Sequence, residues 1–136
     1  MLKYLLDTNI VIYVIKRKPL SVLDTFNRHT GHLAISSITL AELMFGTEKS
    51  SDSARNLTAV QEFCSHLAVL DYGAKAAAHY GSIRAGLERQ GASIGGNDLH
   101  IAAHARSEGL TLVSNNLREF ERVPGLLMEN WLAAAV

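Results

Sequence analysis

The chain has 136 residues and no formal net charge at pH 7, because 13 lysine and arginine residues balance 13 aspartate and glutamate residues. This balance excludes the overall positive field typical of proteins that bind nucleic acid without specificity, and leaves room only for a local basic patch. The single cysteine excludes an internal disulfide, and no apolar run has the roughly 18–20 residues of a membrane span. We therefore expect a cytoplasmic chain without a signal peptide or membrane contact, with one domain over residues 1–132 and a frayed tail over residues 133–136.

Short apolar runs alternate along the chain with longer segments whose apolar residues recur at helical spacing. In chain order the pattern predicts a strand at Leu2–Leu6, helices at Ile10–Lys16 and Ser21–Arg28, a strand at Leu33–Ser36, helices at Thr39–Thr47 and Ala54–Phe63, a strand at Leu67–Leu70, helices at Ala74–Arg89 and Asn97–Ser107, a strand at Leu110–Val113 and a last short strand near Leu126–Glu129. The strands are apolar throughout, which is typical of parallel strands buried on both faces. We therefore predict an α/β fold with a central, mainly parallel sheet of four to five strands and helices on both sides.

Three acidic residues lie where an open α/β sheet usually builds its functional site. Asp7 ends the first strand, Glu42 lies in the first turns of the helix after the second strand, and Asp98 starts the helix before the fourth strand. Carboxylates that are buried together repel one another unless a cation neutralises them. Mg²⁺ and Mn²⁺ prefer carboxylate and water oxygens, and such ions promote hydrolysis of phosphodiesters.

Each of these acids also has a purely structural interpretation. Asp7 is a suitable N-cap for the helix that follows it. Glu42 ends a Thr39-Leu40-Ala41-Glu42 segment that matches the capping-box pattern, in which the glutamate bonds back to the cap amide. Asp98 in a first helical turn would interact favourably with the helix dipole. The residue types alone leave both interpretations open.

Two histidines raise the alternative of a zinc site. His100 and His104 are four residues apart and therefore share one face of their predicted helix. At about 100° per residue, they lie roughly 200–240° around the helix from Asp98. We therefore expect them to point away from the acids, in a packing or solvated role, and we expect Cys64 to be a buried structural thiol.

Four segments carry a resemblance to a known family. YLLDTN (4–9), ISSITLAEL (35–43), NDLHIAAHA (97–105) and LVSNN (112–116) resemble, in this order and spacing, the four motifs of PIN-domain ribonucleases. More closely, the chain resembles the VapC toxins of bacterial toxin–antitoxin pairs, of the enteric type. The resemblance covers almost the whole chain and implies a PIN-like three-layer α/β/α sandwich.

The resemblance also implies roles for the residues at matching positions. It implies that Asp7, Glu42 and Asp98 bind Mg²⁺ or Mn²⁺ and activate the hydrolytic water. It further implies that Thr8 and Ser114 give polar support near the metal, and we add Asn9 of the first motif to this supporting group.

The fourth acid of the family is the position at which this sequence departs from the pattern. Many relatives carry an aspartate where Asn116 stands. Asn116 offers an oxygen but no charge, and Glu119, three residues on, is the alternative source of the missing carboxylate. An ordinary solvated role for Glu119 is an equal alternative.

The resemblance implies an endoribonuclease toxin with a cognate VapB-type antitoxin and a homodimeric state. The RNA substrate implied is structured, with the anticodon loop of a tRNA, and initiator tRNA in particular, as the expected target. Candidate phosphate contacts are the basic residues Arg84, Arg89, Lys16, Arg17 and Lys18, for each of which a solvated surface charge is the alternative.

Two other functions compete with this one. A catalytically weak PIN-like module that binds RNA or regulates would fit the loss of an acid at Asn116. A phosphatase of the haloacid-dehalogenase type would use Asp7 as nucleophile, but it needs a second aspartate where Asn9 stands.

Overall fold

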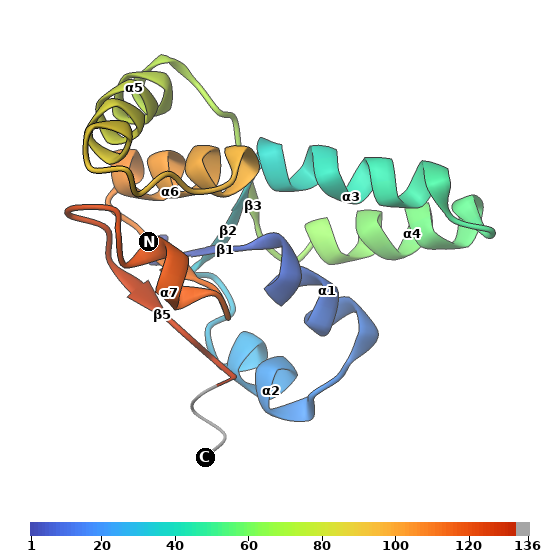
Figure 1. Cartoon of the computed structure of the whole chain (residues 1–136). Helices are drawn as coiled ribbons and strands as arrows, with labels where there is room; N and C mark the ends of the chain where they lie inside the picture. The colour runs from blue at the N-terminus through green and yellow to red at the C-terminus, as the bar shows by residue number, and fades with distance from the viewer. Residues whose placement is uncertain (133–136) are drawn as a thin grey trace.

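The computed structural model describes residues 1–132, so the expected frayed tail at 133–136 lies outside the described residues. Its elements, in chain order, are β1 (Tyr4–Leu6), α1 (Thr8–Lys16), α2 (Leu20–Arg28), β2 (Leu33–Ser36), α3 (Ser37–Lys49), α4 (Ser53–Cys64), β3 (Ala68–Leu70), α5 (Ala74–Arg89), α6 (Gly96–Glu108), β4 (Thr111–Val113), α7 (Leu117–Phe120) and β5 (Met128–Glu129) (Figure 1). All the predicted strands and helices are therefore present. The strand β2 has the predicted bounds, the other four strands are shorter than predicted, and the short helix α7 was not predicted as a separate element.

The five strands form one sheet in the order β3-β2-β1-β4-β5, and all neighbouring strands are parallel. This confirms the predicted parallel sheet and its size. Strands β2 and β3 follow β1 outward on one side of the sheet, whereas β4 and β5 lie on the other side of β1. The carboxyl ends of β1 and β4 therefore flank the point where the strand order reverses, which is where such sheets form binding crevices.

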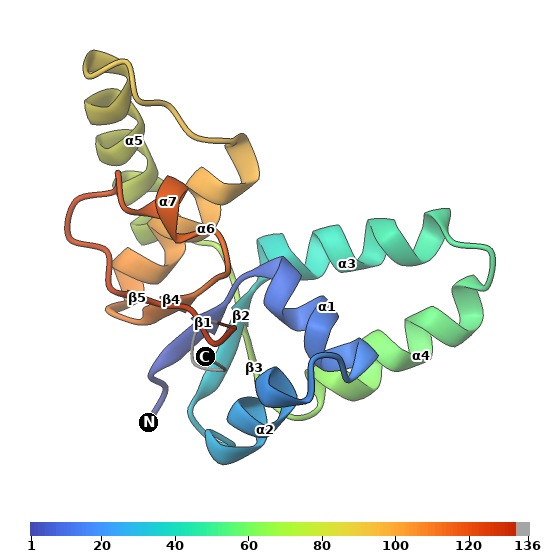
Figure 2. The same ribbon diagram turned by 60° about the horizontal axis from the view of Figure 1, so that its bottom comes forward.

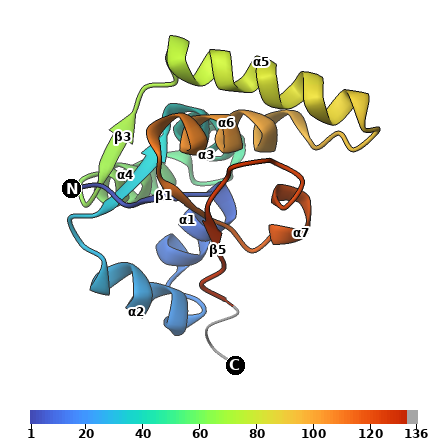
Figure 3. The same ribbon diagram turned by 90° about the vertical axis from the view of Figure 1, so that its left-hand side faces the viewer.

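Helices cover both faces of the sheet, as predicted from strands that are apolar throughout. Leu5 and Leu112 belong to a buried cluster with side chains of α5 and α6, whereas Leu6 and Val113 belong to a second cluster with α1, α2, α3 and α4. Successive side chains of a strand point to opposite faces, so β1, β2 and β4 each contribute to both cores. Figures 1 and 3 show α5 and α6 on one side of the sheet and α1 and α2 on the other. The predicted three-layer α/β/α sandwich is confirmed.

Helices α3 and α4 form an antiparallel pair that projects from the sheet, as Figures 1 and 2 show from two directions. The first turns of α3 lie beside the sheet, and its far end lies well away from it. Leu43 of α3 and Val60 and Phe63 of α4 are buried in the second core cluster and attach the pair to the rest of the fold.

The start of α3 differs from the prediction, with a consequence for Glu42. The Oγ of Ser36 accepts a hydrogen bond from the amide of Ile38 at 3.1 Å, so Ser36 is the N-cap and the helix begins two residues earlier than predicted. Thr39 therefore lies inside the helix, fully buried, and cannot act as the cap. The capping-box interpretation of Glu42 is wrong. Within residues 1–132, no helix is long and apolar enough to cross a membrane.

Candidate active site

Asp7 is fixed at the carboxyl end of β1 by hydrogen bonds on both carboxylate oxygens. The Thr8 amide donates to Oδ1 at 2.8 Å, and the Ser114 hydroxyl donates to Oδ2 at 2.8 Å. Pairing of β1 with β4 brings Ser114 into position, because the Asp7 amide also donates to the carbonyl of Val113 at 2.9 Å. Asp7 is thus the N-cap of α1, as one interpretation predicted, and it also lines a cavity with the other acids, as the second interpretation predicted.

Glu42 is held by donors from two other helices. The Thr8 hydroxyl donates to Oε1 at 2.7 Å, and the Asn97 side-chain amide donates to Oε2 at 3.0 Å. These bonds join α3 to the starts of α1 and α6, so the Glu42 carboxylate is oriented by tertiary contacts and not by its own helix. Asn97 was not among the predicted site residues, although its position beside Asp98 is a signal that could have identified it.

Asp98 is the third residue of α6 and is only partly exposed. Burial, followed by the negative charges of Asp7 and Glu119, raises the pKa of its carboxyl from 3.8 to about 6. Burial also raises the pKa of Asp7, against the opposing effect of its hydrogen bonds from Ser114 and Thr8. The carboxyl groups therefore destabilise one another's charged forms, as expected of acids collected without a counter-charge.

The three acids line one small cavity, which we call the acid pocket. Its volume is about 150 Å³, and its lining residues are Asp7, Thr8, Asn9, Glu42, Asp98 and Asn116. The fold thus brings together residues from four distant segments that were singled out from the sequence. Within residues 1–132, no three histidine, cysteine, aspartate or glutamate side chains already form a metal-ligating group. The side chains that line the pocket offer carboxylate, hydroxyl and amide oxygens as metal ligands. Such ligands suit Mg²⁺ or Mn²⁺ rather than zinc.

Glu119 and Asn116 lie side by side near the acids. The Asn116 side-chain amide donates to Oε2 of Glu119 at 3.0 Å, and the Gly95 amide donates to its Oε1 at 2.8 Å. The charge of Glu119 also raises the pKa of both Asp7 and Asp98. Only Asn116 of the two lines the acid pocket itself. Glu119 is therefore close enough to influence the site, and its role as a metal ligand stays a prediction.

The histidines lie away from the acid pocket and pack between elements, as predicted. His104 is 1% exposed, and its Nδ1 forms a hydrogen bond of 2.7 Å with Oγ of Ser36. The Nδ1 of His100 bonds to the Tyr72 hydroxyl at 2.8 Å, and its ring stacks on that of Tyr80. Neither histidine joins a metal-ligating group within residues 1–132. Cys64 is partly buried and packs against the second core cluster, so the expectation of a buried structural thiol is met only in part.

None of the five predicted RNA-contacting residues lines the acid pocket. Lys16, Arg17 and Lys18 lie at the far end of α1, about 13 Å from Thr8 for a nine-residue helix. Arg89 is an exposed residue at the far end of α5, and Arg84 lines a neighbouring cavity beside the first turn of α6. The guanidinium of Arg84 already donates to Glu88 at 2.9 Å. These contacts stay predictions, and only an extended substrate would reach them.

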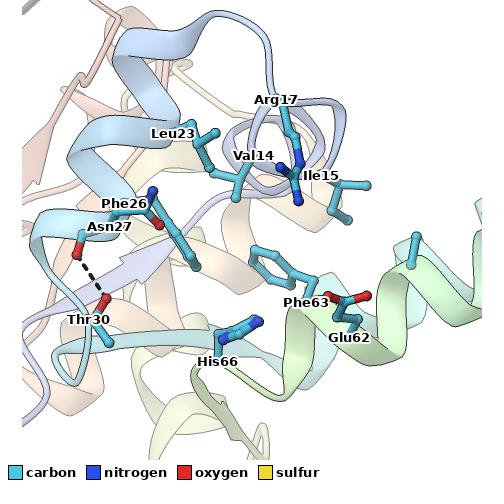
Figure 4. Close-up of a pocket in the computed structure, with 11 residues that line it drawn as sticks. Val14, Ile15, Arg17, Leu23, Phe26, Asn27, Thr30, Glu62, Phe63 and His66 are labelled. Carbon is cyan, nitrogen blue, oxygen red and sulfur yellow. Dashed lines mark hydrogen bonds between the residues drawn. The ribbon is translucent and has the colours of Figure 1, made fainter.

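A second, larger cavity of about 290 Å³ lies between α1, α2 and α4. The stacked rings of Phe26 and Phe63, whose centroids are 5.5 Å apart, lie on two of its sides. Figure 4 shows Arg17 and Glu62 at its edge, with Leu23 and Val14 beside the rings. The cavity thus combines apolar side chains with polar and charged ones in nearly equal measure, and none of its lining residues lines the acid pocket.

Comparison with known proteins agrees with the geometry of the site. The family model described as PIN domain matches residues 4–126. A Haemophilus influenzae protein called Ribonuclease VapC2 is 62% identical over 97% of this chain and all of its own length. The Shigella flexneri protein called tRNA(fMet)-specific endonuclease VapC is 56% identical over 96% of this chain and 99% of its own.

Solved structures give the same result. A chain in the crystal structure of DNA-bound VapBC from Salmonella typhimurium superposes with a TM-score of 0.92 at 53% identity, covering 96% of this chain and 99% of that one. VapBC2 from Rickettsia felis superposes with a TM-score of 0.90 at 42% identity, over 96% and 99% of the two chains. These matches give no support to the haloacid-dehalogenase alternative. The chain belongs to the PIN-domain family and, within it, to the VapC ribonucleases.

Proposed function

We propose that the chain is the toxin of a type II toxin–antitoxin pair and a Mg²⁺- or Mn²⁺-dependent endoribonuclease. The observation that carries this proposal is the acid pocket, a single cavity that Asp7, Glu42 and Asp98 from three distant segments line together. The raised pKa of Asp98, about 6, indicates that the group lacks a counter-charge. A divalent cation is the simplest ligand that supplies one.

In this proposal Asp7, Glu42 and Asp98 hold the cation, with Asn116 or Glu119 completing the site. A bound divalent cation polarises a phosphodiester and lowers the pKa of water, which is the chemistry needed for hydrolysis at neutral pH. The protein contributes orientation. Ser114 and the Thr8 amide fix the Asp7 carboxylate, while the Thr8 hydroxyl and Asn97 fix that of Glu42. Side chains that are positioned in advance do not have to reorganise during the reaction.

We infer that the substrate is structured RNA and that the cleaved bond lies in the anticodon loop of a tRNA. A single-stranded loop exposes backbone and bases, which can enter a cavity of about 150 Å³. In a regular duplex the bases are paired and stacked, so little of the RNA can enter such a cavity. Initiator tRNA is the specific candidate, because two relatives at 56% and 53% identity are called tRNA(fMet)-specific endonucleases. A cytoplasmic location is part of this proposal, because tRNA is a cytoplasmic substrate.

A VapB-type antitoxin is the partner we propose, since several similar solved structures are VapBC complexes. The cavity between α1, α2 and α4 is the surface that suits an apolar segment of such a partner, with Arg17 and Glu62 available to pair with its charges. A homodimer is part of the same proposal, and the mass of the purified chain in solution tests it.

The proposed activity is tested with purified chain, initiator tRNA and elongator methionine tRNA. We expect cuts in the anticodon loop of initiator tRNA when Mg²⁺ or Mn²⁺ is present, no cuts with a chelator, and little cutting of the elongator. Binding of RNA that stays intact with Mn²⁺ would instead support the catalytically weak RNA-binding module. Cleavage that continues in the chelator would contradict metal dependence.

A further inference from the structure

Helix α3 presents an unusually exposed aromatic side chain close to the acid pocket. Phe45 is 66% exposed, and the ammonium of Lys49 lies 5.5 Å from the centre of its ring. Phenylalanine is usually buried, and a cation at this distance is attracted to the face of the ring. Gly46, next to Phe45, is also exposed, and a Cβ placed on it would meet no atom within 4 Å. An aromatic face, a cation and open space for a ligand are therefore adjacent.

The same helix carries Glu42, whose direction is fixed by its hydrogen bonds to Thr8 and Asn97 at the acid pocket. At about 100° per residue, Phe45 lies roughly 60° and Lys49 roughly 20° around the helix from Glu42. They lie about 4.5 Å and 10.5 Å further along its axis. Glu42, Phe45 and Lys49 thus form one stripe, which leads from the acid pocket along the part of α3 that projects from the sheet (Figure 2).

The composition of this surface favours a nucleotide over a protein partner. A protein interface normally has several bulky apolar residues together at its centre. Here the exposed neighbours of Phe45 on α3 are Ala41, Gly46, Glu48 and Lys49, so the ring is isolated among small and charged residues. An isolated aromatic ring beside a cation is instead the arrangement with which proteins stack a base and contact its phosphate. Glu48 lies roughly 120° from Glu42 around the helix, at the border of the stripe.

We propose that Phe45 and Lys49 form a nucleotide-binding subsite for the RNA substrate, in which a loop base near the cleaved bond stacks on Phe45 and Lys49 contacts a phosphate. The proposal rests on the ribonuclease function proposed above. The Phe45 ring lies about one helical turn from Glu42, so the stacked base belongs to a nucleotide next to the acid pocket and not to a remote part of the RNA. The subsite would position the loop without contacting the reacting atoms.

The test uses the full chain and a synthetic anticodon stem–loop of initiator tRNA. Phe45→Ala removes the stack, Phe45→Trp keeps it, and Leu20→Ala is the matched control because Leu20 is also 66% exposed but lies on α2. We expect Phe45→Ala to raise KM by about 5- to 150-fold, as the loss of one base–aromatic stack does, with kcat unchanged. Phe45→Trp and Leu20→Ala should keep the KM of the wild type.

Two further readouts separate a substrate contact from a structural effect. If Phe45 stacks on a base, an abasic nucleotide at that one loop position should abolish the difference between wild type and Phe45→Ala, as a double-mutant cycle requires. Lys49→Gln should reduce the slope of log affinity against log salt by about 0.7, the value for one phosphate contact on a single strand. If the effects of Phe45→Ala and of the abasic nucleotide are additive at every loop position, Phe45 stacks on no base and the proposal is overturned.

RNA affinity is also measured in an Asp7→Asn background, so that the subsite and the nuclease are tested separately. Phe45-dependent binding by a wild-type chain that cuts no RNA would support the subsite and count against the proposed function. Cleavage with equal KM for Phe45→Ala and Leu20→Ala would overturn the subsite alone. A changed molecular mass or antitoxin affinity of Phe45→Ala with unchanged RNA affinity would show that Phe45 belongs to a protein interface, and would also overturn the proposal.

Discussion

Replacing Asp98 with asparagine should make the metal-free protein more stable at neutral pH while it abolishes RNA cleavage. The pKa of Asp98 is raised from 3.8 to about 6 in the folded chain, mainly by burial and by the charge of Asp7. As the pH rises above about 4, the unfolded chain releases this proton while the folded chain keeps it until about pH 6. The ionised carboxylate therefore lowers the free energy of unfolding progressively across this range, and the loss is constant above it.

The size of the effect follows from the pKa difference. The change from 3.8 to about 6 corresponds to roughly 3 kcal/mol of unfolding free energy above pH 7. Because the carboxyl group is only partly buried, solvent screening reduces the expected gain from Asp98→Asn to about 1–2 kcal/mol. For a chain of this length, that gain raises Tm by about 3–8 °C.

The assay is thermal unfolding of wild type and Asp98→Asn at pH 4 and pH 8, with a chelator and then with Mg²⁺. Asp24→Asn, at an exposed position on α2, is the control for loss of an ordinary surface charge. We expect the advantage of Asp98→Asn to appear at pH 8, to be smaller at pH 4, and to shrink or reverse with Mg²⁺. A gain in Tm that is equal at both pH values, or an Asp98→Asn protein less stable than wild type at pH 8, would refute the claim that the ionised Asp98 carboxylate destabilises the metal-free fold.

Three further predictions concern other parts of the molecule. Glu119→Gln should weaken Mg²⁺-supported cleavage more than Asn116→Ala does, with partial recovery at high Mg²⁺, because a lost ligand charge mainly weakens ion binding. Equal Mg²⁺ dependence of cleavage by Glu119→Gln and wild type would show that Glu119 is not a ligand. Burial lowers the pKa of His104, so the folded chain should lose stability as the pH falls below 6.5, and His104→Gln should flatten this dependence in acid unfolding curves; an unchanged slope would contradict it. Ala59→Arg, which fills the cavity between α1, α2 and α4, should weaken antitoxin binding at least tenfold in a titration and leave RNA cleavage unchanged; full antitoxin affinity would exclude this cavity as the contact.

The positions of the acids could be predicted from the sequence because they depend on short-range patterns. Asp7 directly follows an apolar run, and the end of a buried parallel strand fixes where its carboxylate lies. Asp98 lies in a first helical turn next to glycines, which places it at the same edge of the sheet. The element type and the end of the element predict where these two carboxylates lie, whereas their role as metal ligands was implied by the resemblance to PIN-domain ribonucleases.

Contacts between residues that are distant in the chain could not be predicted from pattern and propensity, and only the family resemblance gave Thr8 and Ser114 as supporting residues of the acids. Asn97 donates to Glu42 across 55 residues, and His104 bonds to Ser36 across 68. The predicted N-cap of α3 was wrong for a related reason. Ser36 and Thr39 are both acceptable N-cap residues, and burial of Thr39 in the tertiary fold decided between them. Pattern and propensity do not contain this information.

The most direct test of the carboxylate account is cleavage of initiator tRNA by wild type, Asp7→Asn and Asp24→Asn at equal concentrations of folded protein. Asparagine keeps the shape of Asp7 and can still accept the hydrogen bond from the Thr8 amide, so the fold should persist. We predict cleavage by wild type and Asp24→Asn with Mn²⁺ and none by Asp7→Asn. Cleavage by a folded Asp7→Asn protein at the wild-type rate would contradict the assignment of the acid pocket as the active site.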